Sequence, residues 1–463
     1  MISMTLAEIA TAVNGRLNDH ADPQARVTGS VEHDSRKVGP GGLFIAINGE
    51  RVDGHDFASQ AIAAGATALL ATSPVDVAAV MVDDVLVALG RLARTIVDRL
   101  DGLTVIGLTG SSGKTSTKDI VAHVCRTMGA TVATAGNFNN ELGHPYTVCQ
   151  ADESTRYLVL EMGARGAGDL THLCEVAPVD IAVVLNVGMA HLDGFGSIEA
   201  TAKAKSELPA ALSPHGTAIL NADDARVSAM AEVTQGTVIN FGTTSRAQVR
   251  ANAIVNDHGR PRFELQTPTG SAQVAMRMYG AHYVSNALAA AGVGHAIGMN
   301  AEDIAASLSS ATRQSVRRMD VFVTDDDLTV IDDSYNANPA SMNAALSALG
   351  EIAQDGRKIA VLGYMAEIQA SEYEAHRDVG RHAADQNVDT VIVVEQVAAA
   401  IAEGARERGA TAHVVDTQEE AISLLDSLRR SGDTILVKGS RYRTWKVADH
   451  LRRQVTVLKE ADA

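Results

Sequence analysis

The chain has 463 residues, 46% of them hydrophobic, and its 39 lysines and arginines against 56 aspartates and glutamates give a formal net charge of −17. At roughly 100–200 residues per domain this length predicts two to four domains, and the acidic balance argues against a protein that holds nucleic acid through clustered cations. The sequence has no run of about 20 strongly apolar residues, the length that a bilayer-spanning helix needs. The N-terminus lacks an export signal, and three scattered cysteines are too few for a disulfide framework. We therefore expect a cytoplasmic, multi-domain globular protein.

The first block, residues 1 to about 100, mixes short helical and strand patterns and ends in an amphipathic run, Leu86–Leu100, that predicts a helix. From Leu103 onward short apolar runs alternate with helical stretches. This is typical of parallel strands that are buried on both faces and joined by helices. The strands expected here are Leu103–Leu108, Tyr157–Leu160, Ile181–Leu185 and Thr217–Leu220.

A hairpin and a second α/β block follow. Between Ala247 and Tyr279 apolar residues recur at every second position and are interrupted by Asn256-Asp257-His258-Gly259, which predicts an antiparallel hairpin insertion. A basic cluster near Arg313–Asp320 marks a boundary, so the predicted domains are 1–100, 101–313 and 314–463. In the last of these we expect a helix over Gln396–Arg406 and strands at Thr329–Ile331, Lys358–Leu362, Thr390–Val394 and Thr434–Val437.

The strongest local motif is Thr109-Gly110-Ser111-Ser112-Gly113-Lys114-Thr115, between an expected strand and a helical run that starts at Ser116. Glycines let successive backbone N–H groups point at a phosphate, and the helix N-terminus adds positive potential. Lys114 would reach the β- and γ-phosphates, and the Thr115 hydroxyl would bind Mg²⁺. A full phosphate-loop pattern has glycine where this chain has Leu108, so a plain glycine-rich turn stays as the alternative. The strand–loop–helix context favours ATP or GTP binding.

Polar residues follow the next two expected strands. Glu161 ends one of them, and Asn186 and His191 follow the other. The carboxyl ends of parallel strands meet at one edge of a sheet, where ligands gather. We therefore favour metal binding for these groups over ordinary loop or core positions.

A helix is expected between Ser197, which can cap it, and Pro209, which would end it. Within it Lys205 falls on the apolar side, beside Ala202 and Leu208, which is unusual for an ammonium group. Helical spacing alone assigns Lys205 no role.

Taken together, these motifs resemble those of the Mur ligase family. The resemblance extends from about Val31 to Arg443 and rests on the runs Thr109–Thr117, Asn139–Gly143, Glu161–Gly163, Asn186–Ser197, Lys203–Lys205 and Asp332–Pro339. It implies a three-domain α/β architecture with a central P-loop ATPase domain and a Rossmann-like C-terminal domain. The runs Asn139–Gly143 and Asp332–Pro339 are most like the members that add a dipeptide.

The resemblance also implies roles for matched residues. Lys114, His191, Lys205 and Arg318 would be catalytic. Thr115, Glu161 and His191 would bind magnesium at one of two sites, and Lys205 matches a lysine that members carry as a carbamate, an anion able to bind the second ion. ATP would contact Gly110, Ser111, Ser112, Gly113, Lys114, Thr115, Ser116, Asn140, His282, Asn286, Arg318 and Asp333. The UDP-sugar would contact Ser35, Arg36, Asn48, Gly49 and His55, and the amino substrate would lie near Tyr335, Asn336 and Asn338.

The activity implied is that of an ATP-dependent ligase, a monomer that joins D-alanyl-D-alanine to UDP-N-acetylmuramoyl-tripeptide through an acyl phosphate in cytoplasmic peptidoglycan precursor synthesis. The alternatives are a Mur-type ligase that adds a single amino acid, a ligase like the folylpolyglutamate synthetases, or a nucleotide-binding scaffold. Tyr364 stands where members usually have an acidic residue, which leaves dipeptide selectivity open. The third residue of the stem peptide is left open between diaminopimelate and lysine.

Overall fold

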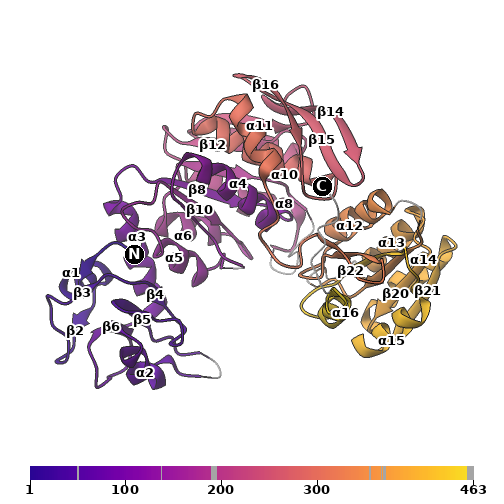
Figure 1. Ribbon diagram of the computed structural model, residues 1–463. Helices are drawn as coiled ribbons and strands as arrows, with labels where there is room; N and C mark the ends of the chain where they lie inside the picture. Colours follow the sequence, from indigo (N-terminus) through magenta and orange to yellow (C-terminus); the bar gives the residue numbers. More distant parts are fainter. Residues whose placement is uncertain are drawn as a thin grey trace.

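The computed structural model describes residues 1–49, 52–136, 138–188, 195–353, 356–366, 368 and 372–455. Three of its four sheets are each the centre of an α/β unit, and the N-terminal and C-terminal units lie on opposite sides of the central one (Figure 1). This agrees with the predicted three-part α/β architecture. In the described residues no helix is long and apolar enough to cross a membrane.

The N-terminal unit contains a five-stranded sheet in the order β2-β7-β6-β5-β4. Its first helix, α1, begins at a capping box in which Thr5 and Glu8 bond each other's backbone, and its last, α3, begins after Asp84, whose carboxylate accepts from the first turn. The elements are β1 (Met4–Thr5), α1 (Leu6–Val13), β2 (Arg16–Leu17), β3 (Arg26–Val27), β4 (Val31–Glu32), β5 (Gly42–Ile45), η1 (Gly54–Phe57), α2 (Ala58–Ala63), β6 (Ala66–Ala71), β7 (Ala79–Met81) and α3 (Val85–Arg99).

The central unit is built on a nine-stranded sheet in the order β16-β15-β14-β13-β12-β11-β8-β10-β9. All four strands expected here are confirmed to within one residue at each end, while β9 and β13 are additional parallel strands. The elements up to β13 are β8 (Thr104–Thr109), α4 (Lys114–Met128), β9 (Thr131–Ala133), α5 (Gly143–Val148), β10 (Tyr157–Glu161), α6 (Asp169–Val176), β11 (Ile181–Val184), α8 (Ile198–Ala210), β12 (Thr217–Asn221), α9 (Ala225–Ser228), η2 (Ala229–Glu232) and β13 (Thr237–Gly242).

The predicted hairpin is confirmed as an antiparallel extension of the central sheet. His258 and Gly259 form its turn with positive φ angles of 50° and 84°, which suits a tight turn between twisted strands. The turn reaches the C-terminal unit, because a Cβ atom on Gly259 would lie 2.5 Å from Cγ1 of Ile352. The elements are β14 (Val249–Asp257), β15 (Arg260–Thr267), β16 (Gly270–Ala275), α10 (His282–Ala296) and α11 (Ala301–Ser310).

The C-terminal unit has a six-stranded sheet in the order β17-β18-β22-β19-β20-β21, parallel except for the β17–β18 pair. The four expected strands are confirmed, but the expected helix Gln396–Arg406 is wrong as one piece, because a 3₁₀ turn precedes α14. The elements are β17 (Asp320–Val323), β18 (Thr329–Asp332), α12 (Pro339–Ile352), β19 (Lys358–Leu362), α13 (Glu372–Asp385), β20 (Thr390–Val394), η4 (Gln396–Ala398), α14 (Ala400–Glu407), β21 (Thr411–Val415), α15 (Gln418–Leu428), β22 (Thr434–Lys438) and α16 (Trp445–Arg452).

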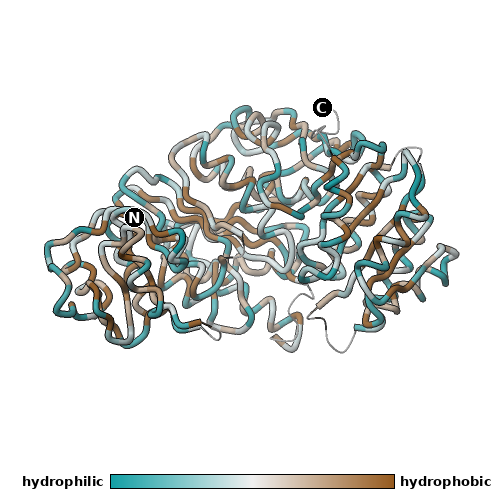
Figure 2. The backbone as a smooth tube through the Cα atoms, turned by 60° about the horizontal axis from the view of Figure 1, so that its bottom comes forward, coloured by the Kyte–Doolittle hydropathy of each residue, from teal (hydrophilic) through white to brown (hydrophobic). Residues whose placement is uncertain are grey.

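The two faces of the central sheet belong to different hydrophobic cores. Because neighbouring strand residues point to opposite faces, Ile106 of β8 lies in one core and Val105 in the other. Brown, hydrophobic segments run through the centres of all three units (Figure 2). The core around Ile106 continues into the C-terminal unit through Met319, Ile331, Met342 and Leu346, and the core around Val105 continues into the N-terminal unit through Ile9, Val85, Leu89 and Leu92.

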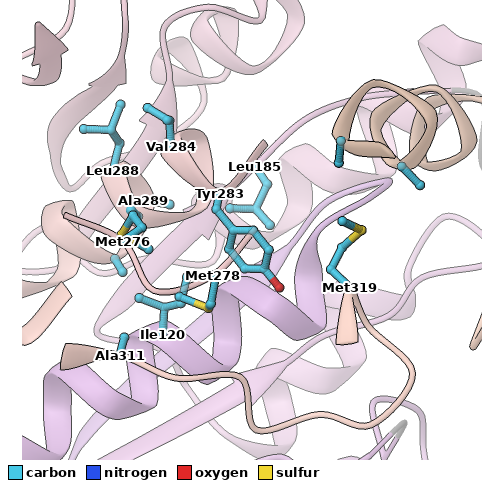
Figure 3. Packing of buried hydrophobic residues seen from close by; sticks show 14 of the residues in the cluster. Ile120, Leu185, Met276, Met278, Tyr283, Val284, Leu288, Ala289, Ala311 and Met319 are labelled. Carbon is cyan, nitrogen blue, oxygen red and sulfur yellow. The ribbon is translucent and has the colours of Figure 1, made fainter. Parts of the chain in front are cut away.

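Helix α10 holds the phosphate-loop helix α4 in place. Tyr283 of α10 packs with Met278 and with Ile120 of α4 in the core that also contains Met319 (Figure 3). α10 is rich in alanine and glycine because it is covered on nearly every side; a Cβ atom on Gly292, for example, would lie 2.7 Å from the Ile219 side chain. This packing fixes the position of α4 relative to the sheet.

Candidate active site

The phosphate loop joins the end of β8 to the start of α4. Gly113 occupies the N-cap with φ of +77°, and no side chain caps the helix. A helix N-terminus left open in this way attracts anions. A Cβ atom on Gly113 would lie 3.0 Å from Oδ1 of Asn286, so a larger residue would crowd the loop.

Asn186 braces this loop from the end of β11. Its Oδ1 accepts from the backbone N–H groups of Ser111 at 3.0 Å and Ser112 at 2.9 Å, and its Nδ2 donates to Ser112 O at 3.1 Å. Gly188 N donates to Ser111 Oγ at 2.8 Å. The sequence suggested metal binding for polar groups at this edge, but here the Asn186 side chain supports the loop through hydrogen bonds.

Lys114 lies across the loop, where its Nζ donates to Gly110 O at 2.8 Å. Burial lowers the pKa of Lys114, the Glu161 carboxylate opposes that shift, and the Arg318 guanidinium adds to it. An anion bound in the loop would stabilise the charged form of Lys114.

Glu161 lies at the end of β10 with 2% of its surface exposed. Its Oε1 accepts from Asn139 Nδ2 at 2.8 Å, and its backbone N–H donates to Thr134 Oγ1 at 3.0 Å. Its Oε2 has no hydrogen-bond partner among the described residues. A buried carboxylate oxygen without a partner is costly, so this oxygen fits a cation ligand.

Thr115 and His191 are the other two ligands expected at the same magnesium ion as Glu161, and the structure describes only Thr115. Thr115 lies in the first turn of α4, close to the loop, whereas His191 falls outside the described residues. Within the described ranges no three His, Cys, Asp or Glu side chains cluster as a metal site. A cation at Glu161 would therefore need other ligands, such as phosphate oxygens.

Lys205 points inward, as its place on the helix suggested. The residue is 3% exposed and lies on the buried side of α8 with Ala204 and Leu208. Burial lowers the pKa of Lys205 to about 7, and the nearby Lys114 contributes further. This shift favours the neutral amine, which is the form that reacts with CO₂.

The expected adenine and ribose contacts gather where α10 meets the C-terminal unit. Asn286 Nδ2 and His282 Nδ1 have no hydrogen-bond partners among the described residues, and burial lowers the pKa of His282 to about 4, so its ring is neutral. Asp333 accepts from Met319 N at 3.1 Å and from the Lys438 ammonium. Sequence reasoning missed Lys438 as a site residue, because 105 residues separate it from its partner.

Three expected binding residues make local structural hydrogen bonds. Asn140 Oδ1 accepts from Gly143 N at 3.0 Å at the start of α5, and Asn338 forms a capping box at the start of α12. The His55 ring bonds Asp53 through Nδ1 at 2.6 Å and accepts from Thr72 N through Nε2 at 3.0 Å. Ligand contact by these side chains would require exchanging those bonds.

The other residues expected to hold the UDP-sugar lie in loops of the N-terminal unit. Arg36 pairs with Asp34 through two 2.8 Å bonds, and Ser35 Oγ donates to Gln60 at 3.3 Å. Asn48 forms an isolated bridge with Asp53, while Gly49 N donates to Val52 O at 3.0 Å.

An aromatic cluster next to these loops joins the N-terminal and central units. The His33 ring packs edge-on against Phe138 at 5.8 Å and Tyr146 at 5.1 Å between centroids. The Tyr146 hydroxyl donates to Glu32 Oε2 at 3.0 Å. Sequence analysis missed Phe138 and Tyr146, since no motif spacing relates them to His33.

Arg318 is presented by a strained segment between the central and C-terminal units. Its guanidinium carbon lies 4.3 Å from the centroid of the Tyr335 ring. Both its neighbours have positive φ, 56° at Arg317 and 47° at Met319, a conformation that costs a non-glycine residue about 1–2 kcal/mol. Arg317 is held by Asp449 at 2.6 Å and by the Trp445 ring at 4.6 Å.

The region expected to hold the amino substrate is tied together by β22 and the loop after it. Lys438 Nζ donates to Asn336 O at 2.9 Å, and Ser440 Oγ donates to Ala337 O at 3.0 Å. Tyr364 stacks on His376 with centroids 5.2 Å apart, beneath Arg443. The backbone of Asn336 and Ala337 is thus fixed by a segment about 100 residues away.

Family models match all three units. The model described as Mur ligase family, catalytic domain, matches residues 28–97; the Mur ligase middle domain matches 108–294; and the Mur ligase, glutamate ligase domain, matches 317–441. These matches cover most of the described fold.

Relatives and solved structures agree over nearly the whole chain. The UDP-N-acetylmuramoyl-tripeptide–D-alanyl-D-alanine ligase of Mycobacterium tuberculosis is 44% identical, covering 95% of this chain and 96% of the relative, and that of Escherichia coli is 37% identical with the same coverage. A crystal structure of MurF from Acinetobacter baumannii is 32% identical with a TM-score of 0.87, covering 97% of this chain and 99% of that one. The MurF ligase of Thermotoga maritima in complex with ADP is 28% identical with a TM-score of 0.78, covering 92% and 98%. The chain belongs to the Mur ligase family.

Proposed function

We propose that this Mur ligase joins D-alanyl-D-alanine to UDP-N-acetylmuramoyl-tripeptide with ATP as co-substrate. The observation that carries the proposal is that relatives with this activity align with 95% of the chain, the C-terminal unit included. The open phosphate loop and the ADP complex of the Thermotoga relative support ATP as the nucleotide. The proposal includes a monomer that works in the cytoplasm on precursors of peptidoglycan.

The three substrates are assigned to three parts of the chain. Residues 1–100 bind the UDP-sugar, residues 101–313 bind ATP, and residues 314–463 bind the dipeptide. One relative from Acinetobacter baumannii, 32% identical with a TM-score of 0.86, is named for an acceptor that ends in 2,6-diaminopimelate.

The reaction needs charge neutralisation and needs no protein nucleophile. The terminal carboxylate of the tripeptide attacks the γ-phosphorus of ATP, the bond to the bridging oxygen breaks, and ADP leaves. The dipeptide amine then attacks the acyl phosphate carbonyl; phosphate leaves and the amine loses a proton as the amide forms. Lys114 and Arg318 neutralise the γ-phosphate and the phosphate that leaves.

The residues present fit a divalent cation. Thr115 and the unpartnered Oε2 of Glu161 would hold magnesium, with His191 as a further ligand. A bound magnesium would supply positive charge between the triphosphate and the attacking carboxylate. The Lys205 amine adds CO₂ with loss of one proton, and the carbamate anion that results is the proposed ligand for a second ion.

A substrate panel tests the function. Phosphate release from ATP should require both UDP-N-acetylmuramoyl-tripeptide and D-alanyl-D-alanine, and mass spectrometry should find the pentapeptide product. Turnover with single amino acids, or with a folate and glutamate, would replace the proposal with the corresponding ligase. ATP binding by calorimetry without turnover on any UDP-peptide would indicate a scaffold.

A further inference from the structure

A cavity of about 390 Å³ lies beside the phosphate loop. It is bounded by α4, the segment that follows β9, and the linker into the C-terminal unit. Thr115 and Arg318 both line it, so it opens where, in the proposed function, the acceptor carboxylate meets the γ-phosphate. The expected ATP and UDP-sugar contacts do not account for the rest of this space.

The charges in the cavity are positive, although the whole chain is acidic. Asp119 is the single acidic residue among the described lining residues; it forms an ion pair with the buried Lys118 and accepts a hydrogen bond from Ser315 Oγ at 2.6 Å. In the described part of the chain no carboxylate pairs with Arg126, and Arg318 rests on the Tyr335 ring. Arg126 and Arg318 therefore remain available to an anion.

The residues of α4 that line the cavity show how a ligand would lie in it. Thr115, Lys118, Ala122 and Arg126 follow one another at spacings of three or four residues, so they share one face of α4. Side chains on a helix lean toward its N-terminus, which brings the Arg126 guanidinium back toward Thr115. A ligand that starts at Thr115 would pass Ala122 before it reaches Arg126.

We propose that this cavity binds the distal end of the third residue of the acceptor peptide, and that Arg126 selects a residue ending in a carboxylate over lysine. The inference rests on the proposed function. A residue of the 2,6-diaminopimelate type has three methylene groups between its two amino-acid centres, so its side chain can lie along Ala122 while its distal carboxylate reaches Arg126. Lysine would place only an ammonium group among these cations, which is repulsive.

Paired kinetics test the selectivity. kcat/KM is measured with the diaminopimelate and lysine forms of UDP-N-acetylmuramoyl-tripeptide for the wild type, Arg126→Met, and the control Arg246→Met. Arg246 is exposed and lines a separate depression near β13. The wild type should prefer the diaminopimelate form by about tenfold, as expected for one charge-assisted hydrogen bond. Arg126→Met should remove that preference by slowing the diaminopimelate substrate while the lysine substrate becomes no slower than with the wild type, and Arg246→Met should keep the preference.

Other outcomes overturn the inference without touching the proposed function. Equal loss on both tripeptides would show that Arg126 does not read the third residue. A raised KM for D-alanyl-D-alanine, the same with either tripeptide, would assign the cavity to the dipeptide carboxylate. A wild type that prefers the lysine form would reverse the charge argument. Only the absence of product from every UDP-tripeptide would count against the proposed function itself.

Discussion

At the scale of single residues, Glu161 combines deep burial with an unpaired oxygen. Glu161→Gln keeps an oxygen that can accept from Asn139 but removes the negative charge. We expect kcat to fall by at least about 100-fold if that charge binds magnesium, while the melting temperature does not fall, because a buried charge is lost. Initial rates and differential scanning calorimetry check both expectations.

The control for this change is Glu175→Gln, which alters an exposed carboxylate on α6. Its activity should equal that of the wild type. A Glu161→Gln protein with normal kcat at saturating magnesium would remove Glu161 from the site.

Lys205 should make the free energy of unfolding depend on pH. Its folded-state pKa of about 7 lies below the ordinary value of 10.5, so between these pH values the unfolded chain binds more protons. The free energy of unfolding contributed by Lys205 therefore rises with pH across this window and is lowest below pH 7. Relative to Lys205→Met, the wild type should gain stability from pH 7 to 9 in bicarbonate-free urea titrations.

Carbamate formation adds a second readout at the same residue. Bicarbonate should raise the melting temperature of the wild type and leave Lys205→Met unchanged. Lys203→Met, at an exposed position on the same helix, should behave like the wild type in both experiments. A pH dependence shared by Lys205→Met and the wild type would show that Lys205 titrates as an ordinary lysine.

At the scale of elements, the segment before β17 has a strained backbone that positions Arg318. Arg317 holds a left-handed backbone next to Arg318, and its side chain is anchored to α16 through Asp449 and Trp445. Arg317→Ala releases this anchor, so we expect kcat to fall about tenfold through displacement of Arg318, with a smaller change in the KM for ATP. Steady-state kinetics against Arg453→Ala, an exposed arginine after α16, checks this; an unchanged kcat would contradict it.

The same scale shows what the sequence could predict. Strands such as β8 and β19 were predictable because both of their faces are buried and their apolar runs are continuous. β9 was missed because its three residues are only half-buried at the sheet edge, and β13 because polar residues interrupt it. The helix predicted before β21 was too long because an alanine-rich run does not indicate where a 3₁₀ turn ends and α14 begins.

The residues of the candidate site also fall into those that the sequence could predict and those that it could not. Phosphate-loop residues are contiguous, so a local pattern predicts them. Glu161 and Asn139 are 22 residues apart, Lys438 and Asp333 are 105 apart, and Trp445 donates to Ser334 O across 111 residues. No spacing within a segment indicates such pairs, because the fold alone brings them together.

At the scale of the whole molecule, the β14–β15 turn of the central unit lies against α12 of the C-terminal unit. Gly259→Ala places a methyl group against Ile352 and strains a φ of +84°, whereas Gly409→Ala strains a similar φ of +89° in open space. Both should lose about 1–2 kcal/mol from backbone strain, and Gly259→Ala about 1–3 kcal/mol more from overpacking. Calorimetry should therefore find Gly259→Ala the less stable.

Kinetic measurements on Gly259→Ala and Gly409→Ala test whether the contact at the turn affects catalysis as well as stability. If the turn helps place the C-terminal unit over the phosphate loop, Gly259→Ala should also lower kcat at temperatures where both variants are folded. Equal stability and equal rates in the two variants would show that the turn tolerates displacement.

The division of the central sheet between two cores has a consequence for synthesis on the ribosome. The N-terminal unit emerges first, yet the apolar side of its helix α3 packs against α5 and α6 of the central unit, in the core that also contains Val105 and Leu158. A nascent chain paused near residue 100 would carry that surface uncovered and would attract chaperones. The opposite face of the central sheet is likewise incomplete until α10 and α11, which follow its last strand, are translated, so each segment depends on the next to cover its apolar surface.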